Sequence, residues 1–125
     1  MATTVGMPSS GSAIVTSLLA ASAAKYIAWG TGVTAYAATQ TALITPAAEA
    51  RTAGTQTQQT TDHTSDTYQV VGTITCASAG KSITEAGIFD ASSSGNMYCR
   101  AAFTALALDV GDSIQFTFQV KHDHS

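Results

Sequence analysis

Charge is scarce in this chain. Charged residues make up 10% of the 125 positions, against roughly 25% in ordinary soluble domains. The polar surface must therefore be built mainly from Thr, Ser, Gln and Asn. With so little charge to keep copies apart, such a surface favours contacts with neighbours in an assembly over an isolated monomer.

Basic clusters and long hydrophobic runs are also missing. The five Lys and Arg residues are scattered, so nucleic-acid binding is not expected. The most apolar stretch, residues 13–24, is interrupted by Thr16, Ser17 and Ser22 and falls short of the about 20 residues that span a bilayer. A signal peptide requires Lys or Arg before its apolar stretch, and none precedes this one. We therefore expect a protein made in the cytoplasm, with no membrane partner.

Cysteine is limited to Cys76 and Cys99, which are too few for a disulfide framework and lack the spacing of a zinc site. Both fall on apolar faces of predicted strands, which favours two small buried thiols. A bridge between them stays open at this point, because it depends on a Cα separation that sequence does not give.

The side chains that catalysis requires are not grouped. No Ser or Thr lies in a nucleophile elbow, and no Gly-rich phosphate loop is present. The histidines of segment 122–124 lie on a chain end without fixed geometry for a metal. Glu85 lies mid-strand, where we expect an exposed carboxylate or a structural pair with Arg51 or Arg100. The sequence thus predicts no enzyme, no catalytic residue, no cofactor and no metal site.

Strict alternation of apolar and polar residues is the clearest positive signal. It is unbroken in residues 114–121, which indicates an antiparallel strand with one buried face. Segments 67–77, 81–90 and 96–104 are also predicted strands, separated by Gly- and Ser-containing turns. The pattern predicts a mainly β domain, an antiparallel β-sandwich or barrel-like fold with one short N-terminal helix. Its expected core includes Ile74, Phe103, Ile114, Phe116, Phe118 and Val120.

Two segments lack the apolar face that packing requires. Residues 1–12 are small and polar, which is typical of a flexible arm before a single domain over residues 13–125. Ser12 is predicted to cap a helix over residues 13–23. The Thr- and Gln-rich segment 48–60 is expected at a sheet edge or in a subunit interface. The candidate assembly contacts from these two segments are Ala2, Thr3, Thr4, Val5, Met7, Pro8, Gln56, Gln58 and Gln59.

Several segments, taken in order, resemble one family. They are Tyr26–Gly32, Thr41–Leu43, Glu49–Arg51, Thr67–Thr73, Ile83–Asp90 and Gly111–Phe118. Together they are similar to small tailed-bacteriophage virion proteins, which include capsid decoration (cement) proteins and tail-fibre-like proteins. The resemblance covers about residues 14–120, and its most specific part is the Glu-Ala-Gly-Ile-Phe-Asp segment. It implies a structural role in the virion and names no active residues.

Three functions follow from the composition and this resemblance. The first is a capsid decoration protein, expected as a trimer that binds the major capsid protein on the assembled shell. The second is a tail, neck or fibre component that uses the domain as a spacer or attachment module. The third, a carbohydrate-binding module, requires exposed aromatic rings, for which the candidates are Tyr26, Trp29, Tyr36 and Tyr98.

Overall fold

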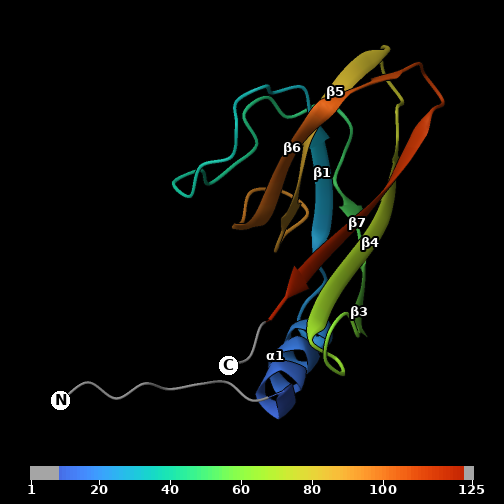
Figure 1. The fold of residues 1–125 in the computed structure, drawn as a ribbon. Coiled ribbons are helices and arrows are strands. Elements are labelled where there is room, and N and C mark those ends of the chain that lie inside the picture. The colour runs from blue at the N-terminus through green and yellow to red at the C-terminus, as the bar shows by residue number, and fades with distance from the viewer. Residues whose placement is uncertain (1–8, 123–125) are drawn as a thin grey trace.

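A computed structural model describes residues 9–122, which form one helix and seven strands (Figure 1). The elements in chain order are α1 (Ser9–Ala21), β1 (Tyr26–Gly30), β2 (Thr52–Ala53), β3 (Thr55–Gln59), β4 (Thr67–Thr75), β5 (Lys81–Phe89), β6 (Met97–Leu108) and β7 (Ser113–Lys121). The mainly β antiparallel domain with one short helix, expected from the alternation, is confirmed.

The strands form two antiparallel sheets that pack face to face. One sheet has the strand order β2-β1-β5-β6, and the other has the order β3-β4-β7. The core between them combines side chains from both sheets, namely Ile27, Trp29, Ile83 and Ile88 from the first and Tyr68, Val70 and Ile74 from the second. The architecture is therefore a β-sandwich, held together by apolar burial between its two inner faces.

The last strand has the inward face that its alternation predicted. Nine consecutive pairs join β7 to β4, from Thr67 opposite Lys121 to Thr75 opposite Ser113. Gly72 lies opposite Phe116 and leaves space for the core, because a Cβ atom there would lie 2.8 Å from Cδ1 of Ile27.

The predicted burial of the core residues is correct for one of them and too high for the other five. Ile74 is buried, but the other five expected core residues are only half-buried. The physical reason is their position, since β6 and β7 are the outermost strands of their sheets and are covered on one side only. The half-buried residues are Phe103, Ile114, Phe116, Phe118 and Val120.

The helix begins four residues earlier than expected. It starts at Ser9, so Ser12 lies inside α1 and is not its cap, and residues 9–12 of the predicted arm form helix. Ser12 is fully buried, and its Oγ donates to the carbonyl of His122 at 2.8 Å. Thr16, one turn later on the same face, is also buried and donates to the carbonyl of Ser65. These buried hydrogen bonds fix the first turns of the helix to the domain.

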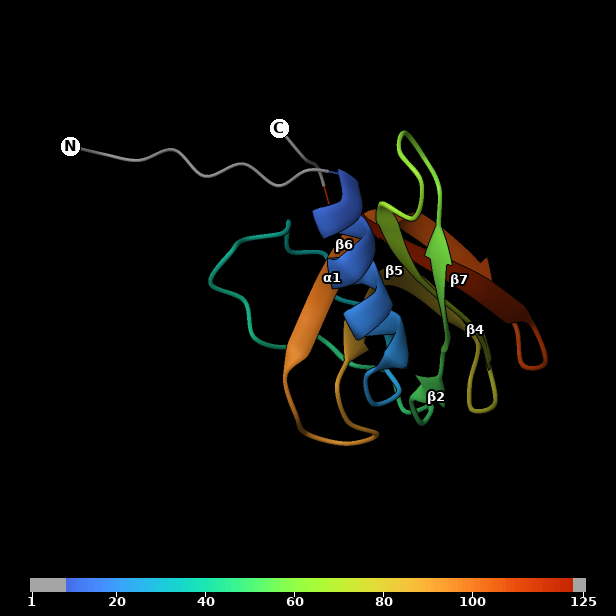
Figure 2. The ribbon, with the colours of Figure 1, turned by 90° about the horizontal axis from the view of Figure 1, so that it is seen from below.

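The helix α1 and the long connection 31–51 cover different parts of the sandwich. The helix α1 packs on β3 and β4, whereas the long connection 31–51 lies on the side of β6 (Figure 2). The connection covers a second small core of Ala28, Leu43 and Phe89 on the outer face of the four-stranded sheet. Among residues 9–122, no helix is long and apolar enough to cross a membrane.

Candidate assembly surface

Two of the predicted contact residues bind within the chain. The Gln56 amide donates to the carbonyl of Ser22 at 3.1 Å and accepts from the hydroxyl of Tyr68. The Gln58 amide donates to Oγ1 of Thr16 at 2.9 Å. The strand β3 does lie at a sheet edge, as predicted. Its polar face, however, holds α1 in place.

The other predicted contacts are less engaged with the fold. Gln59 is half-buried and donates to Oγ1 of the nearby Thr57 at 3.0 Å. Ala2, Thr3, Thr4, Val5, Met7 and Pro8 lie outside the described residues. A partner role for these residues therefore stays a prediction.

Glu85 is fully buried and fixes the connection 31–51 to the sheet. Its carboxylate accepts from the backbone N–H groups of Gly32, Ile44 and Thr45 at 3.2, 3.0 and 2.8 Å. It also forms a fully buried ion pair with Arg100, at 2.8 Å between Nη2 and Oε2. Burial raises the pKa of Glu85, but these hydrogen bonds outweigh it and hold the pKa below its usual value.

The pairing of Glu85 with Arg100, one of the alternatives predicted from sequence, is confirmed. Arg100 uses its remaining donors on the carbonyl of Thr34 at 2.8 Å and on the amide oxygen of Gln40 at 3.1 Å. Arg51, the other candidate base, instead lies over the ring of Phe89, 3.6 Å from its centroid. The Glu85–Arg100 pair is thus a structural clamp, with its polar atoms directed at the protein itself.

Glu49 forms a second clamp at the end of the same connection. It accepts from Nε1 of Trp29 at 3.1 Å, from Oγ of Ser78 at 3.0 Å and from the ammonium group of Lys81. Burial raises the pKa of Glu49, but the hydrogen bonds from Lys81 and Trp29 outweigh it, so that its pKa lies well below the usual range. Sequence reasoning missed this role, because the donors come from two distant segments, Trp29 on β1 and the residues 78–81.

Asp66 organises the turn before β4. Its carboxylate accepts from the backbone N–H groups of Thr61, Asp62 and His63 at 3.0 to 3.1 Å. Although burial raises the pKa of Asp66, these bonds lower it well below the usual range. An acid next to a turn commonly binds backbone N–H groups in this way. All three buried carboxylates therefore act as loop anchors.

Metal and thiol chemistry find no assembled site in the described part of the chain. Residues 9–122 contain no group of three His, Cys, Asp or Glu side chains that could hold a metal ion. Cys76 and Cys99 are free thiols, so the bridge left open by sequence is not formed. Cys76 lies in the core, and Cys99 is half-buried, which raises its thiol pKa.

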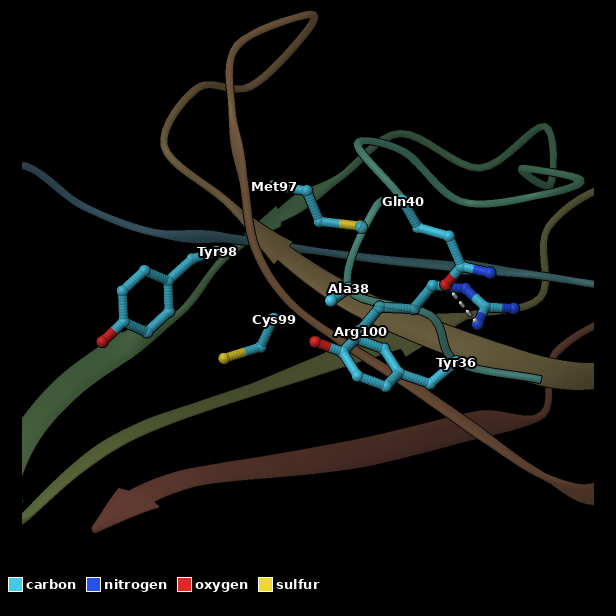
Figure 3. Close-up of a pocket in the computed structure, with 7 residues that line it drawn as sticks. All are labelled: Tyr36, Ala38, Gln40, Met97, Tyr98, Cys99 and Arg100. Atoms are coloured by element: carbon cyan, nitrogen blue, oxygen red, sulfur yellow. Dashed lines mark hydrogen bonds between the residues drawn. The ribbon is translucent and has the colours of Figure 1, made fainter. Parts of the chain in front are cut away.

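A shallow cavity of about 280 Å³ lies between the connection 31–51 and the start of β6 (Figure 3). Tyr36 and Tyr98, with exposed fractions of 64% and 40%, are on its lining together with Cys99. Figure 3 also shows the hydrogen bond between Arg100 and Gln40 along one side. Both of these polar groups are engaged with the protein, which leaves the tyrosine rings as the main groups a ligand would meet.

The four aromatic candidates for carbohydrate stacking differ in exposure to solvent. Trp29 is only 1% exposed and lies in the core, so it is not available to a ligand. Tyr26 is half-buried, whereas Tyr36 and Tyr98 reach the surface. Two of the four expected rings are therefore accessible.

Exposed apolar side chains occur on three parts of the described surface. They are Ile14 and Leu18 on α1, Val33, Tyr36 and Ile44 on the connection 31–51, and Tyr98, Leu106 and Val110 on β6 and the turn after it. The exposed fraction reaches 68% for Leu18 and 84% for Val33.

Fold and surface together define a small scaffold-type β-sandwich, whose buried acids anchor its own loops and whose surface is short of charge. A family model described as "Podophage GP4 fiber I protein gp80" matches residues 12–120. The chain therefore belongs to this podophage fibre protein family, and the resemblance to tailed-phage virion structural proteins is confirmed as tail-fibre-like. Comparison with the curated proteins and with the solved structures gave no significant match.

Proposed function

We propose that the chain is a non-enzymatic structural component of a podophage virion fibre, in which the domain acts as a rigid spacer or attachment module. The observation that carries this proposal is the family match over residues 12–120, which spans nearly the whole domain. From sequence alone, a fibre role ranked second to capsid decoration. The family description supports the fibre role more directly.

The geometry is consistent with a rigid module. The three carboxylate clamps hold the connection 31–51 and the turn 60–66 against the sheets. Loops held by several buried hydrogen bonds open rarely, since opening leaves charged groups without partners in a low-dielectric interior. A fibre component transmits load and orientation, and both require such rigidity.

Capsid decoration remains a second candidate because of the surface composition. A surface with 10% charged residues and exposed apolar groups on several elements suits a protein covered by neighbours. In this role, copies would bind the major capsid protein on the assembled shell, as a trimer at local three-fold positions. Because they bind the shell and not its separated subunits, they would stabilise it by mass action.

Locating the protein in the virion separates the two candidates. Gold-labelled antibody against the chain, viewed by electron microscopy on purified virions, is expected to mark the fibres. Label over the capsid shell would favour decoration instead. Virions that lack the chain altogether would contradict both roles, and antibody-free virions with gold conjugate alone serve as the control.

We further propose that the predicted arm contacts, Ala2 to Pro8, bind a neighbouring protein. Because α1 begins at Ser9, deletion of residues 2–8 leaves the helix and its buried Ser12 contact intact. Seven extended residues reach roughly 25 Å, enough to cross to an adjacent subunit. The deletion is expected to leave the melting temperature unchanged and to reduce incorporation into virions, measured by complementation of a phage that lacks the gene. Normal incorporation would remove the arm from the assembly surface.

A further inference from the structure

The four edge strands of the sandwich differ in how they are protected. The strand β2 has two residues, and β3 has five and lies against α1. The strand β6 is irregular, with two register shifts against β5. The strand β7 has nine residues and pairs with β4 at nine consecutive positions without a shift. Length and regularity make β7 the most exposed template for an additional strand.

Natural edge strands usually carry charge, proline or a bulge that prevents such pairing. Within β7, none of these devices occurs before Lys121 at its last position. Its outward face presents Ser113, Gln115, Thr117 and Gln119, all exposed and uncharged. Its inward face presents Ile114, Phe116, Phe118 and Val120, all half-buried. Among the described residues, no strand pairs with β7 on the side away from β4.

We propose that this free edge binds β7 of a second copy of the chain. The two β7 strands would be antiparallel and related by a two-fold axis that passes between their Thr117 residues. This inference rests on the proposed structural role and specifies the surface through which copies meet. The pairing joins two three-stranded sheets into one six-stranded sheet. Two-fold pairing of one strand with itself closes after two copies. It thus predicts a dimer in place of the trimer expected from sequence.

The sequence of β7 fits this register. With Thr117 on the axis, Phe116 lies opposite the partner's Phe118, and Ile114 lies opposite the partner's Val120. Every inward residue then meets an inward residue, because side chains alternate with a period of two. The pairing would cover the half-buried aromatic face and would place Gln115 opposite the partner's Gln119. A charge-free edge raises no like-charge repulsion against its own copy, which favours a second copy as the occupant.

The available area is sufficient for a specific contact. Nine strand residues extend about 30 Å, and the sandwich is about 20 Å deep from one outer face to the other. A contact of this size covers on the order of 600 Å² per copy, or about 1,200 Å² in total, which reaches the lower end of specific interfaces. The half-buried rings supply the apolar centre that such an interface needs.

A charge swap tests both the edge and the register. The variant Gln115→Lys with Gln119→Lys puts like charges opposite each other at both paired positions, so we expect association to weaken more than tenfold. The variant Gln115→Lys with Gln119→Glu puts opposite charges there and is expected to keep the dimer. Both residues are exposed, so the fold tolerates either change. The matched control, Thr55→Lys with Thr73→Lys, adds the same charge to exposed positions of the two neighbouring strands and should leave the dimer intact.

The measurement is the mass of the purified full-length protein by sedimentation or light scattering over a range of concentrations. The proposal expects a wild-type species of two 12.7-kDa chains, dissociated by the like-charge variant only. A wild-type monomer or trimer would overturn it, and so would equal behaviour of the two charge variants. None of these results bears on where the protein lies in the virion, so the interface and the proposed fibre role fail independently.

Discussion

The two sides of the sandwich are finished in different ways. On one side, β2 and β3 are separated only by Gly54, and α1 packs over β3 and β4 through Gln56 and Gln58. On the other side, β6 and β7 are joined by a short turn but belong to different sheets, with half-buried aromatic residues between them. The first side is closed by the chain itself, and the second carries the β7 edge that we propose to bind another copy.

This difference separates stability from assembly. Fully buried residues such as Ile27 and Trp29 lie on the inner strand β1, whereas Phe103 and Phe116 lie on the outermost strands β6 and β7. The ring centroids of Phe103 and Phe116 are 6.3 Å apart, and both side chains are only half-buried. Burial of apolar area stabilises the fold in proportion to the area removed from water. Residues on the closed side should therefore determine folding, and residues on the open side should determine association.

The largest contrast is expected between two aromatic truncations. Trp29→Ala removes a fully buried ring and should cost about 3–5 kcal/mol. Phe118→Ala removes a half-buried ring of the open side and should cost about half as much. Chemical denaturation of both variants, under conditions where the protein is monomeric, measures the difference. Equal costs would show that the two sides contribute alike to folding.

Breaking the Glu85 clamp should destabilise the domain by about as much as Trp29→Ala. Glu85→Ala leaves Arg100 buried without its counter-ion, which typically costs about 3–5 kcal/mol. Replacing both partners by Ala should cost less than the sum of the single changes, because no buried charge is left. Thermal denaturation of the two single variants and the double variant measures the coupling. Strict additivity would contradict the clamp.

Acid should weaken the fold in a defined pH range. The pKa values of Glu49, Glu85 and Asp66 lie below the ordinary values of 4.5 for Glu and 3.8 for Asp. Below those ordinary values the unfolded chain takes up protons that the folded protein does not, so stability is lost as the pH falls. The melting temperature should be nearly constant from pH 7 to about 5 and should fall from there to pH 3.

A Glu49→Gln variant serves as the control for this pH dependence. It should be less stable at pH 7 and should show a shallower fall in acid, because one of the three groups no longer titrates. A wild-type melting temperature that does not change between pH 5 and pH 3 would contradict the assignment of these acids as anchors.

The smallest effect is expected from the hydrogen bonds between Gln58 of β3 and the helix α1. Gln58→Ala removes hydrogen bonds from the amide to the carbonyl of Ala13 and to Oγ1 of Thr16, and should cost about 1 kcal/mol. Hydrogen exchange should become faster in α1 and stay unchanged in β5. The exposed Thr55→Ala on the same strand is the matched control. Uniform acceleration in both elements would mean that the helix does not open separately.

The features that sequence could predict are local ones. Alternation in residues 114–121 predicted the strand and its inward face, because side-chain direction follows the backbone period. It could not predict that this strand is outermost in its sheet, since strand order depends on contacts distant in sequence. Phe116 and Phe118 are therefore on the expected face but less buried than expected.

The candidate site shows the same limit. Gln56 and Gln58 were expected to contact a partner because no apolar face accompanies them, yet α1 lies on their side of the strand. Glu85 could be recognised because a mid-strand acid needs a base, and Arg100 supplies it. Glu49 carried no such local signal, because its donors come from β1, from the turn after β4 and from Lys81.

The hydrogen bond between Ser12 and His122 holds the two ends of the described chain together at one end of the domain. Both ends of the described chain meet at the pole that carries α1, while the turns after β4 and β6 meet at the opposite pole, where Gly111 donates to the carbonyl of Cys76 at 2.8 Å (Figure 1). Any segment fused to either end would leave from the same pole. The opposite pole, with the turns after β4 and β6, would then face away from the point of attachment.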